Sequence, residues 1–302
     1  MKLYDKVINH LRWRLSRIGS DSRMDDIAYI KKKYKQMVGH ECDLENPQAL
    51  TEKIQWLKLY NHNPSYTKMA DKYEAKKYVA GLIGEEHIIP TYGVWDSFDE
   101  IDFDSLPDQF ILKCTHNSGG FVICKDKNTF DKKAAKKRLT DCLNHNYFYS
   151  GREWVYKNIK PRIIAEKYID SLGKPDSVEY KTTCFNGKVG FVTICTGIAH
   201  SDFELRTNDH YDVDFHHMPW YVNYKNADVP PKKPEQWDEL IAICEKLSKD
   251  IPYVRVDTYI IDGQIYFGEM TFYTWSGFMK FNPPEWDLKL GEMLVLPDKK
   301  IQ

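Results

Sequence analysis

The chain has 302 residues, of which 42% are hydrophobic and 29% are charged, and its 43 Lys and Arg residues balance 44 Asp and Glu residues to a net charge of -1. This composition is typical of a folded protein and excludes wholesale disorder and collagen-like structure. The near-zero net charge argues against a nucleic-acid partner. No uncharged run approaches the roughly 20 residues that span a bilayer, and the 7 cysteines include no CxxC pair. We therefore expect a cytoplasmic protein with reduced thiols.

The first segment, residues 1–19, has the pattern of a basic amphipathic helix. Its apolar positions fall at helical spacing, and its basic residues lie elsewhere on the cylinder. The apolar positions are Tyr4, Val7, Ile8, Leu11, Leu15 and Ile18. Such a helix packs on the core or on a second subunit, or it attaches the protein peripherally to the anionic inner face of a membrane. The sequence leaves both interpretations open, and the oligomeric state with them.

The rest of the chain alternates helical and strand patterns. Residues 47–85 read as helices, and two further helical patterns cover residues 131–147 and 236–249. From residue 109 onward, short β-rich runs are separated by glycine turns. Strand pairs mixed with helices predict an α+β fold and argue against a doubly wound parallel sheet.

The stretch QFILKCTHNSGGFVIC places Lys113 at the end of a strand, before a loop that contains Ser118, Gly119 and Gly120. Glycines let backbone N–H groups approach an anion closely, and a neighbouring lysine supplies positive charge. A β-loop-β cover over phosphate groups is one interpretation. An ordinary hairpin turn is the other, and the spacing does not match a P-loop.

The stretch YVRVDTYIIDGQIYFGEMTF carries charged residues on a predicted hairpin. Alternation places Arg255 and Asp257 on the face opposite the apolar residues of their strand, and Glu269 and Thr271 lie two apart on the returning strand. Hard oxygen ligands on adjacent strands suit Mg²⁺ that also holds nucleotide phosphates. A surface hairpin with a cross-strand ion pair is the alternative.

The proposed metal site sets a requirement on this hairpin. A simple two-residue turn with unbroken pairing would place the two carboxylates on opposite faces of the sheet. We therefore predict an odd-length loop or a bulge between Asp257 and Glu269. A three-residue loop ending at Gly263 would satisfy this requirement with Arg255 opposite Glu269.

Two further runs carry charge. In RIIAEKYI, Glu166 and Lys167 end an apolar strand, and in VEYKTTCFNGK, Glu179 and Lys181 share one face of a strand that leads to an Asn-Gly turn. Each run by itself is compatible with solvated surface charge.

In their order along the chain these motifs resemble the ATP-grasp superfamily, and most closely its TupA-like family, named for teichuronopeptide synthesis. The stretches that carry the resemblance are NPQALTEKIQWLKLYNHNP, ADKYEAKKYV, FILKCTHNSGG, IIAEKYI, EYKTTCFNGK and RVDTYIIDGQIYFGEMTF. They cover roughly residues 46–292. The resemblance implies an ATP-grasp fold with a helical N-terminal region (1–107), a small β-rich lid (108–170) and a larger C-terminal lobe (171–302).

The resemblance also implies a set of functional residues. The nucleotide contacts would be Lys76, Lys113, Ser118, Gly119, Gly120, Glu166, Lys167, Ile169 and Glu179, with Lys72 and Lys77 as alternatives to Lys76. The stretch 166–169 would form a hinge that contacts adenine through its backbone, and Glu179 would contact the ribose. Arg255 and Lys113 would act on the transferring phosphoryl group. Asp257, Glu269 and Thr271 would hold Mg²⁺, although Thr271 stands where the superfamily has Asn.

The implied reaction joins a carboxylate to an amine at the expense of ATP, through an acyl phosphate. The implied setting is cell-surface polysaccharide or capsule synthesis, with a uronic-acid or peptide carboxylate as acceptor and an amino acid or amine as donor. A sugar kinase or glycosyltransferase of the same pathway, and a nucleotide-binding protein without turnover, remain as alternatives. The cluster HHMPWY at residues 216–221 is predicted to be a packed loop, with sugar stacking as the alternative.

Overall fold

The computed structural model describes residues 24–174, 176–198 and 202–298, so the helix expected over residues 1–19 lies outside the described part. Two antiparallel sheets organise the chain. The smaller has the strand order β1-β4-β2-β3 and the larger the order β10-β9-β5-β6-β7-β8. The smaller sheet consists of β1 (Thr91–Trp95), β2 (Phe110–Cys114), β3 (Phe121–Cys124) and β4 (Ile163–Lys167). The larger consists of β5 (Val178–Phe185), β6 (Lys188–Thr196), β7 (Thr207–Tyr211), β8 (His217–Met218), β9 (Tyr253–Ile261) and β10 (Gln264–Thr271).

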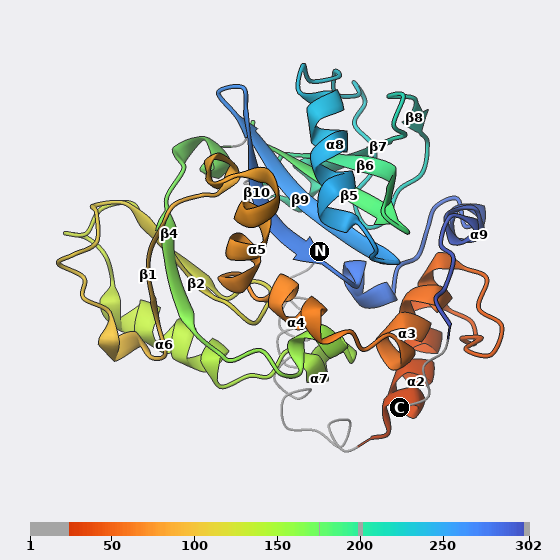
Figure 1. Cartoon of the computed structure of the whole chain (residues 1–302), viewed down its shortest axis with the longest axis horizontal. Coiled ribbons are helices and arrows are strands. Elements are labelled where there is room, and N and C mark those ends of the chain that lie inside the picture. The colour runs from red at the N-terminus through yellow and green to blue at the C-terminus, as the bar shows by residue number, and fades with distance from the viewer. Residues whose placement is uncertain (1–23, 175, 199–201, 299–302) are drawn as a thin grey trace.

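The helices surround and join the two sheets. They are α2 (Asp26–Val38), α3 (Leu50–Tyr60), α4 (Pro64–Ala70), α5 (Glu74–Ile83), α6 (Lys132–Leu143), α7 (Phe148–Gly151), α8 (Trp237–Ser248) and α9 (Glu285–Glu292). In Figure 1 the small sheet with α6 lies on one side of the molecule, and the large sheet with α8 on its face lies on the other, with α4 and α5 between them. This arrangement confirms the predicted α+β class.

The helix pattern follows the spacing of buried residues. In α8 the buried side chains include Trp237, Leu240, Cys244 and Leu247, which share one face of the helix against the large sheet. The small sheet has a separate apolar cluster with α6. Each sheet therefore has its own core, and α4 and α5 contact β10 at the side of the large sheet that faces the small one.

The structure also describes the cysteines and the stretch at residues 216–221. None of the 7 cysteines, all of which lie in described segments, is paired in a disulfide. In the stretch HHMPWY, Trp220 is buried and stacks on His210 with ring centroids 3.5 Å apart. His217 and Met218 form the short strand β8, and His216 is exposed, so the predicted packed loop is correct only around Trp220. Within the described ranges, the structure contains no helix of the length and apolarity needed to cross a membrane.

The β9-β10 hairpin shows how Asp257 and Glu269 come to share one face of the sheet. Its turn has two residues, Asp262 and Gly263, with φ values of 51° and 80°, so the predicted three-residue loop is wrong. The predicted alternative, a bulge, is present. Thr258 pairs with Phe267 and Asp257 pairs with Glu269, which leaves Gly268 unpaired.

The bulge changes the register that the sequence suggested. Arg255 pairs with Thr271 and not with Glu269, and Asp257 lies directly opposite Glu269. The burial of β10 shows the same shift, because Ile265 and Phe267 face the core before the bulge and Met270 faces it afterwards. One extra residue thus brings Arg255, Asp257, Glu269 and Thr271 to a common face.

Replacing Gly268 tests the bulge. A Cβ at this position would stand 3.0 Å from the Asp257 carbonyl oxygen and 3.1 Å from Tyr259 Cε2. We expect Gly268→Ala to lower the free energy of unfolding by about 1–3 kcal/mol, because the strand must shift to accept the methyl group. Urea unfolding measures this change.

A matched control is Gly81→Ala in α5, where a Cβ meets no atom within 4 Å. That variant should be as stable as the wild type or more stable, because alanine favours a helix over glycine. Equal stability of Gly268→Ala and the wild type would contradict the proposed tight bulge.

Candidate functional site

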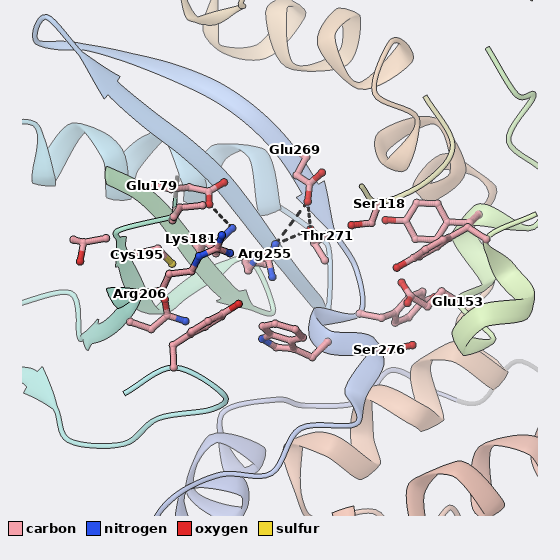
Figure 2. Close-up of a pocket in the computed structure, with 18 residues that line it drawn as sticks. Ser118, Glu153, Glu179, Lys181, Cys195, Arg206, Arg255, Glu269, Thr271 and Ser276 are labelled. Carbon is pink, nitrogen blue, oxygen red and sulfur yellow. Dashed lines mark hydrogen bonds and ion pairs between the residues drawn. The ribbon is translucent and has the colours of Figure 1, made fainter. Parts of the chain in front are cut away.

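A cavity of about 330 Å³ lies against the charged face of the large sheet. Six residues predicted or noted from the sequence line it, and they are Ser118, Glu179, Lys181, Arg255, Glu269 and Thr271. Figure 2 shows Glu179, Lys181 and Arg206 on one side of this cavity, Ser118, Glu153 and Ser276 on the other, and Glu269 with Thr271 between them. The cavity therefore joins strands β5, β9 and β10 to the loop after β2.

A chain of ion pairs crosses β5 and β9. The Arg255 Nε and Nη2 atoms donate to the two carboxylate oxygens of Asp257 at 2.6 and 2.7 Å. Lys181 Nζ lies 3.1 Å from Asp257 Oδ2 and 2.6 Å from Glu179 Oε2. Burial opposes the charge of Lys181, yet the Asp257 carboxylate raises the pKa of Lys181 above its ordinary value. Lys181 therefore stays charged beside the cavity.

Glu269 is held by cations from two elements. Lys72, in the turn before α5, places its Nζ atom 2.9 Å from Glu269 Oε2, and Arg255 Nη2 lies 3.7 Å from Glu269 Oε1. The Thr271 hydroxyl donates to Glu269 Oε1 at 3.1 Å. The Lys72 ammonium lowers the pKa of Glu269 well below its usual range. Lys72, an alternative in the sequence analysis, is thus the lysine of this segment that contacts the predicted metal residues.

The predicted metal residues have the donor chemistry that Mg²⁺ requires. Asp257 and Glu269 are opposite one another on one face, and the Thr271 hydroxyl adjoins them, so two carboxylates and a hydroxyl can converge on a cation. Asp257 is 1% exposed and lies beneath Arg255, away from the cavity wall. In segments 24–174, 176–198 and 202–298, no three Asp, Glu, His or Cys side chains form a closed metal cage. The set therefore fits an ion that takes further ligands from phosphate groups.

A second charged cluster lies between the small sheet and α5. Glu166, whose side chain is 6% exposed, receives Lys76 Nζ at 2.6 Å on one oxygen and Lys113 Nζ at 2.6 Å on the other. Burial opposes ionisation of Glu166, but the two ammonium groups lower its pKa to about 2. Glu166 thereby fixes the two predicted phosphate-binding lysines in place. Lys77 is exposed and pairs with Glu74 on the surface.

The low pKa of Glu166 predicts a pH dependence of stability. Because its pKa falls from 4.5 in the unfolded chain to about 2 in the folded one, its contribution of about 3 kcal/mol is complete above pH 4.5 and is lost as the pH falls toward 2. We expect Glu166→Gln to flatten the pH dependence of urea unfolding between about pH 5 and about pH 3.

The control for this experiment is Glu86→Gln, which changes an exposed carboxyl group. It should leave the pH dependence close to that of the wild type. If the free energy of unfolding of Glu166→Gln depended on pH as steeply as that of the wild type, the proposed ionisation of Glu166 would be wrong.

The glycine loop adjoins the cavity through its serine. Ser118 lines the cavity, Gly119 has a φ of 81°, and the Gly120 carbonyl accepts from Cys114 N–H at 2.7 Å. Arg138 on α6 donates to the Gly119 carbonyl at 3.2 Å. The loop is thus the turn between two paired strands, with one end anchored to α6, and its role over phosphates stays a prediction.

The other predicted hinge residues lie away from this cavity. The Lys167 side chain faces an open groove with Tyr92 and Gln109, because it alternates with the inward-facing Glu166. Its N–H donates to the Pro90 carbonyl at 2.9 Å, and the Ile169 carbonyl accepts from Leu172 N–H at 3.1 Å. A role of these two residues in adenine binding therefore stays a prediction.

The cavity also contains residues that the sequence analysis did not assign to the site. They are Tyr147, Glu153, Tyr156, Cys195, Thr196, Ile198, Arg206, Asn208, Tyr224, Tyr273, Trp275 and Ser276. Lys181, which the sequence analysis noted without a role, could have been assigned to the site because it shares a strand face with Glu179. Glu153 and Trp275 lie in irregular segments, where no periodicity indicates the direction of a side chain.

Comparison with known proteins identifies the family. The family described as TupA-like ATP-grasp matches residues 52–295. The chain belongs to the TupA-like ATP-grasp family. This match confirms the resemblance that the sequence motifs indicated, and with it the predicted ATP-grasp fold. No curated protein matches the sequence.

Solved structures with related folds are ligases and synthetases of low identity. The D-alanine–D-alanine ligase of Bacillus anthracis complexed with ATP is 18% identical with a TM-score of 0.37, over 67% of this chain and 53% of its own. The D-cycloserine synthetase DcsG is 15% identical with a TM-score of 0.42, over 75% and 69% of the two chains. The ADP complex of the N5-carboxyaminoimidazole ribonucleotide synthetase PurK is 16% identical with a TM-score of 0.42, over 80% and 56%. The chain thus spans about half the length of the first of these ligases.

Proposed function

We propose that this TupA-like ATP-grasp protein is an ATP-dependent carboxylate-amine ligase. The observation that carries the proposal is the convergence of Lys72, Lys181 and Arg255 on Asp257 and Glu269. Lys181, Arg255 and Glu269 line the cavity, and Asp257 lies beneath them. Such a set can neutralise a triphosphate and hold a divalent cation at the same time. The match of residues 52–295 to the TupA-like ATP-grasp family supports the choice of ATP as the nucleotide.

The residues have separate tasks in this proposal. Lys76 and Lys113 bind phosphate oxygens, and Glu166 keeps their ammonium groups at the site before the nucleotide arrives. Arg255 stabilises the negative charge that develops as a substrate carboxylate attacks the γ-phosphate. Asp257, Glu269 and Thr271 would hold Mg²⁺, which would supply further charge neutralisation on the phosphates. Closure of the lid over the bound nucleotide would limit hydrolysis of the acyl phosphate by water.

The acceptor in this proposal is a uronic-acid or peptide carboxylate of a cell-surface polysaccharide. The TupA-like family is named for teichuronopeptide synthesis, which suggests a polysaccharide setting, and the cavity wall supports a sugar. Tyr224, Tyr273 and Trp275 present aromatic rings beside polar groups, a combination that suits a pyranose ring. A screen of uronic acids against amino acids, read by ADP release and mass detection of the adduct, tests this pairing.

Substitutions in the two charged clusters test the nucleotide site. We expect Lys113→Ala and Glu269→Gln each to reduce ADP formation by at least about a hundredfold, because each removes a charge that balances the phosphates or the cation. The measurement is ADP release by the full chain with MgATP and the substrate pair from the screen.

The matched control is Lys77→Ala, which changes an exposed lysine one residue after Lys76. It should keep wild-type ADP formation. Unchanged activity in Lys113→Ala or Glu269→Gln would contradict the proposed site.

Trapping with hydroxylamine distinguishes the ligase reaction from a kinase reaction. It is a small neutral nucleophile that intercepts acyl phosphates, so a ligase given acceptor, MgATP and hydroxylamine should form a hydroxamate in step with ADP. A stable phosphate ester formed without any amine would favour the kinase, and tight ATP binding with no ADP formed from any acceptor would favour a protein without turnover.

A further inference from the structure

Glu153 is a buried carboxylate at the boundary of two cavities. It is 5% exposed and lines both the cavity described above and an adjoining outer cavity of about 970 Å³. Figure 2 places it with Ser276 on the side of the inner cavity opposite Glu179 and Lys181. A carboxylate is costly to bury unless something balances its charge. The surroundings of Glu153 therefore need an explanation.

The nearest candidate counterion is already occupied. Lys58, which is 2% exposed, donates to Gln55 Oε1 at 2.9 Å, to the Gly151 carbonyl at 2.8 Å and to the Ser276 carbonyl at 2.5 Å. These three acceptors use the three N–H groups of the ammonium. Throughout the described part of the chain, no basic side chain lies within ion-pair distance of Glu153. The charge of Lys58 acts on Glu153, but no ion pair among the described residues holds the carboxylate, so a cation from outside the protein can bind it.

The cavity wall around Glu153 includes residues with strained backbone conformations. Trp275 and Ser276 have φ values of 50° and 57°, a left-handed conformation that costs about 1–2 kcal/mol for each such residue. Lys58 and Gln55 hold this turn through the Ser276 and Gly277 carbonyls. Strain that buried donors maintain at a cavity wall is a feature of ligand sites. The turn presents Trp275, 49% exposed, to both cavities.

The outer cavity supplies a charge of the opposite sign. Lys33 of α2 lines it and donates to the Ser150 carbonyl at 2.6 Å and to the Tyr29 hydroxyl at 3.1 Å. Because an ammonium group has three N–H donors, one remains for a ligand. Lys33 and Glu153 both line this outer cavity. The shared wall therefore offers one anionic and one cationic contact.

We infer that this shared wall binds the amine substrate as a free amino acid, with its ammonium on Glu153 and its carboxylate on Lys33. The inference rests on the proposed ligase function and adds the site and the chemical class of the amine. In this position the nitrogen lies on the side of Glu153 that faces the inner cavity, where the acyl phosphate forms. A zwitterion fits the two charges, and a neutral amine would leave Lys33 without a role.

Glu153 also has a chemical task in this arrangement. Its carboxylate takes one proton from the ammonium, which frees the nitrogen lone pair to form a bond with the acyl carbon. The bond from that carbon to the phosphate oxygen breaks, and the electron pair leaves with the phosphate. The second nitrogen proton departs with the phosphate as hydrogen phosphate, so the products are the amide and a protonated Glu153. Burial raises the pKa of Glu153 above its ordinary value, which makes its carboxylate a stronger base.

Saturation-transfer NMR tests the site without knowledge of the acceptor. The probes are pools of the common free amino acids, including both enantiomers of alanine, added to the full chain with MgADP. We expect at least one amino acid to bind the wild type, and Glu153→Gln and Lys33→Met each to weaken it by roughly tenfold or more, as expected for loss of a charged hydrogen-bond partner. The controls are Glu45→Gln and Lys31→Met, which change exposed charges outside both cavities.

The outcomes separate this inference from the proposed function. Equal amino-acid binding by Glu153→Gln and the wild type overturns it, and so does the failure of every pool to bind the wild type. If Glu153→Gln does not fold, Glu153→Asp replaces it, and undiminished binding by that folded variant overturns the inference too. Calorimetry of MgADP on the same samples reports on the proposed function. Nucleotide binding without amino-acid binding overturns only the amino-acid site, and absent nucleotide binding contradicts the ligase itself.

Discussion

Buried carboxylates balanced by cations from other segments of the chain are the constraint on which this structure depends. Glu166 is held by Lys76 from α5 and Lys113 from β2, and Glu269 is held by Lys72. A buried charge that loses its partner costs several kcal/mol, so these pairs fix how α5 lies against both sheets. The lysines that bind an incoming phosphate are thereby placed before it arrives, with little reorganisation left for the binding step.

The site and the fold share one structural device, the bulge at Gly268. The same extra residue that keeps Ile265, Phe267 and Met270 in the core turns Glu269 toward Asp257. The hairpin could not satisfy both needs with regular pairing, because alternation would place one of the carboxylates on the wrong face. Stability and charge placement therefore depend on the same backbone irregularity.

The sequence predicted what depends on local patterns. Alternation placed Arg255 with Asp257 on one face of β9, and it required a bulge or an odd loop before Glu269. The register could not be chosen from turn length alone, since Asp262-Gly263 forms an ordinary two-residue turn and the extra residue lies at Gly268. The change of apolar parity between Phe267 and Met270 was the available signal for that position. Glu153 and Trp275 were beyond prediction, because only tertiary packing of irregular segments brings them to the cavity.

A crystal structure with a non-hydrolysable ATP analogue and Mn²⁺ in place of Mg²⁺ tests the central claim most directly. The account predicts an anomalous Mn²⁺ peak within about 2.5 Å of carboxylate oxygens of Glu269 and Asp257. It also predicts that the triphosphate lies between Lys113 on the small sheet and Lys181 on the large one. A nucleotide bound elsewhere, or a Mn²⁺ peak remote from Glu269, would contradict the account.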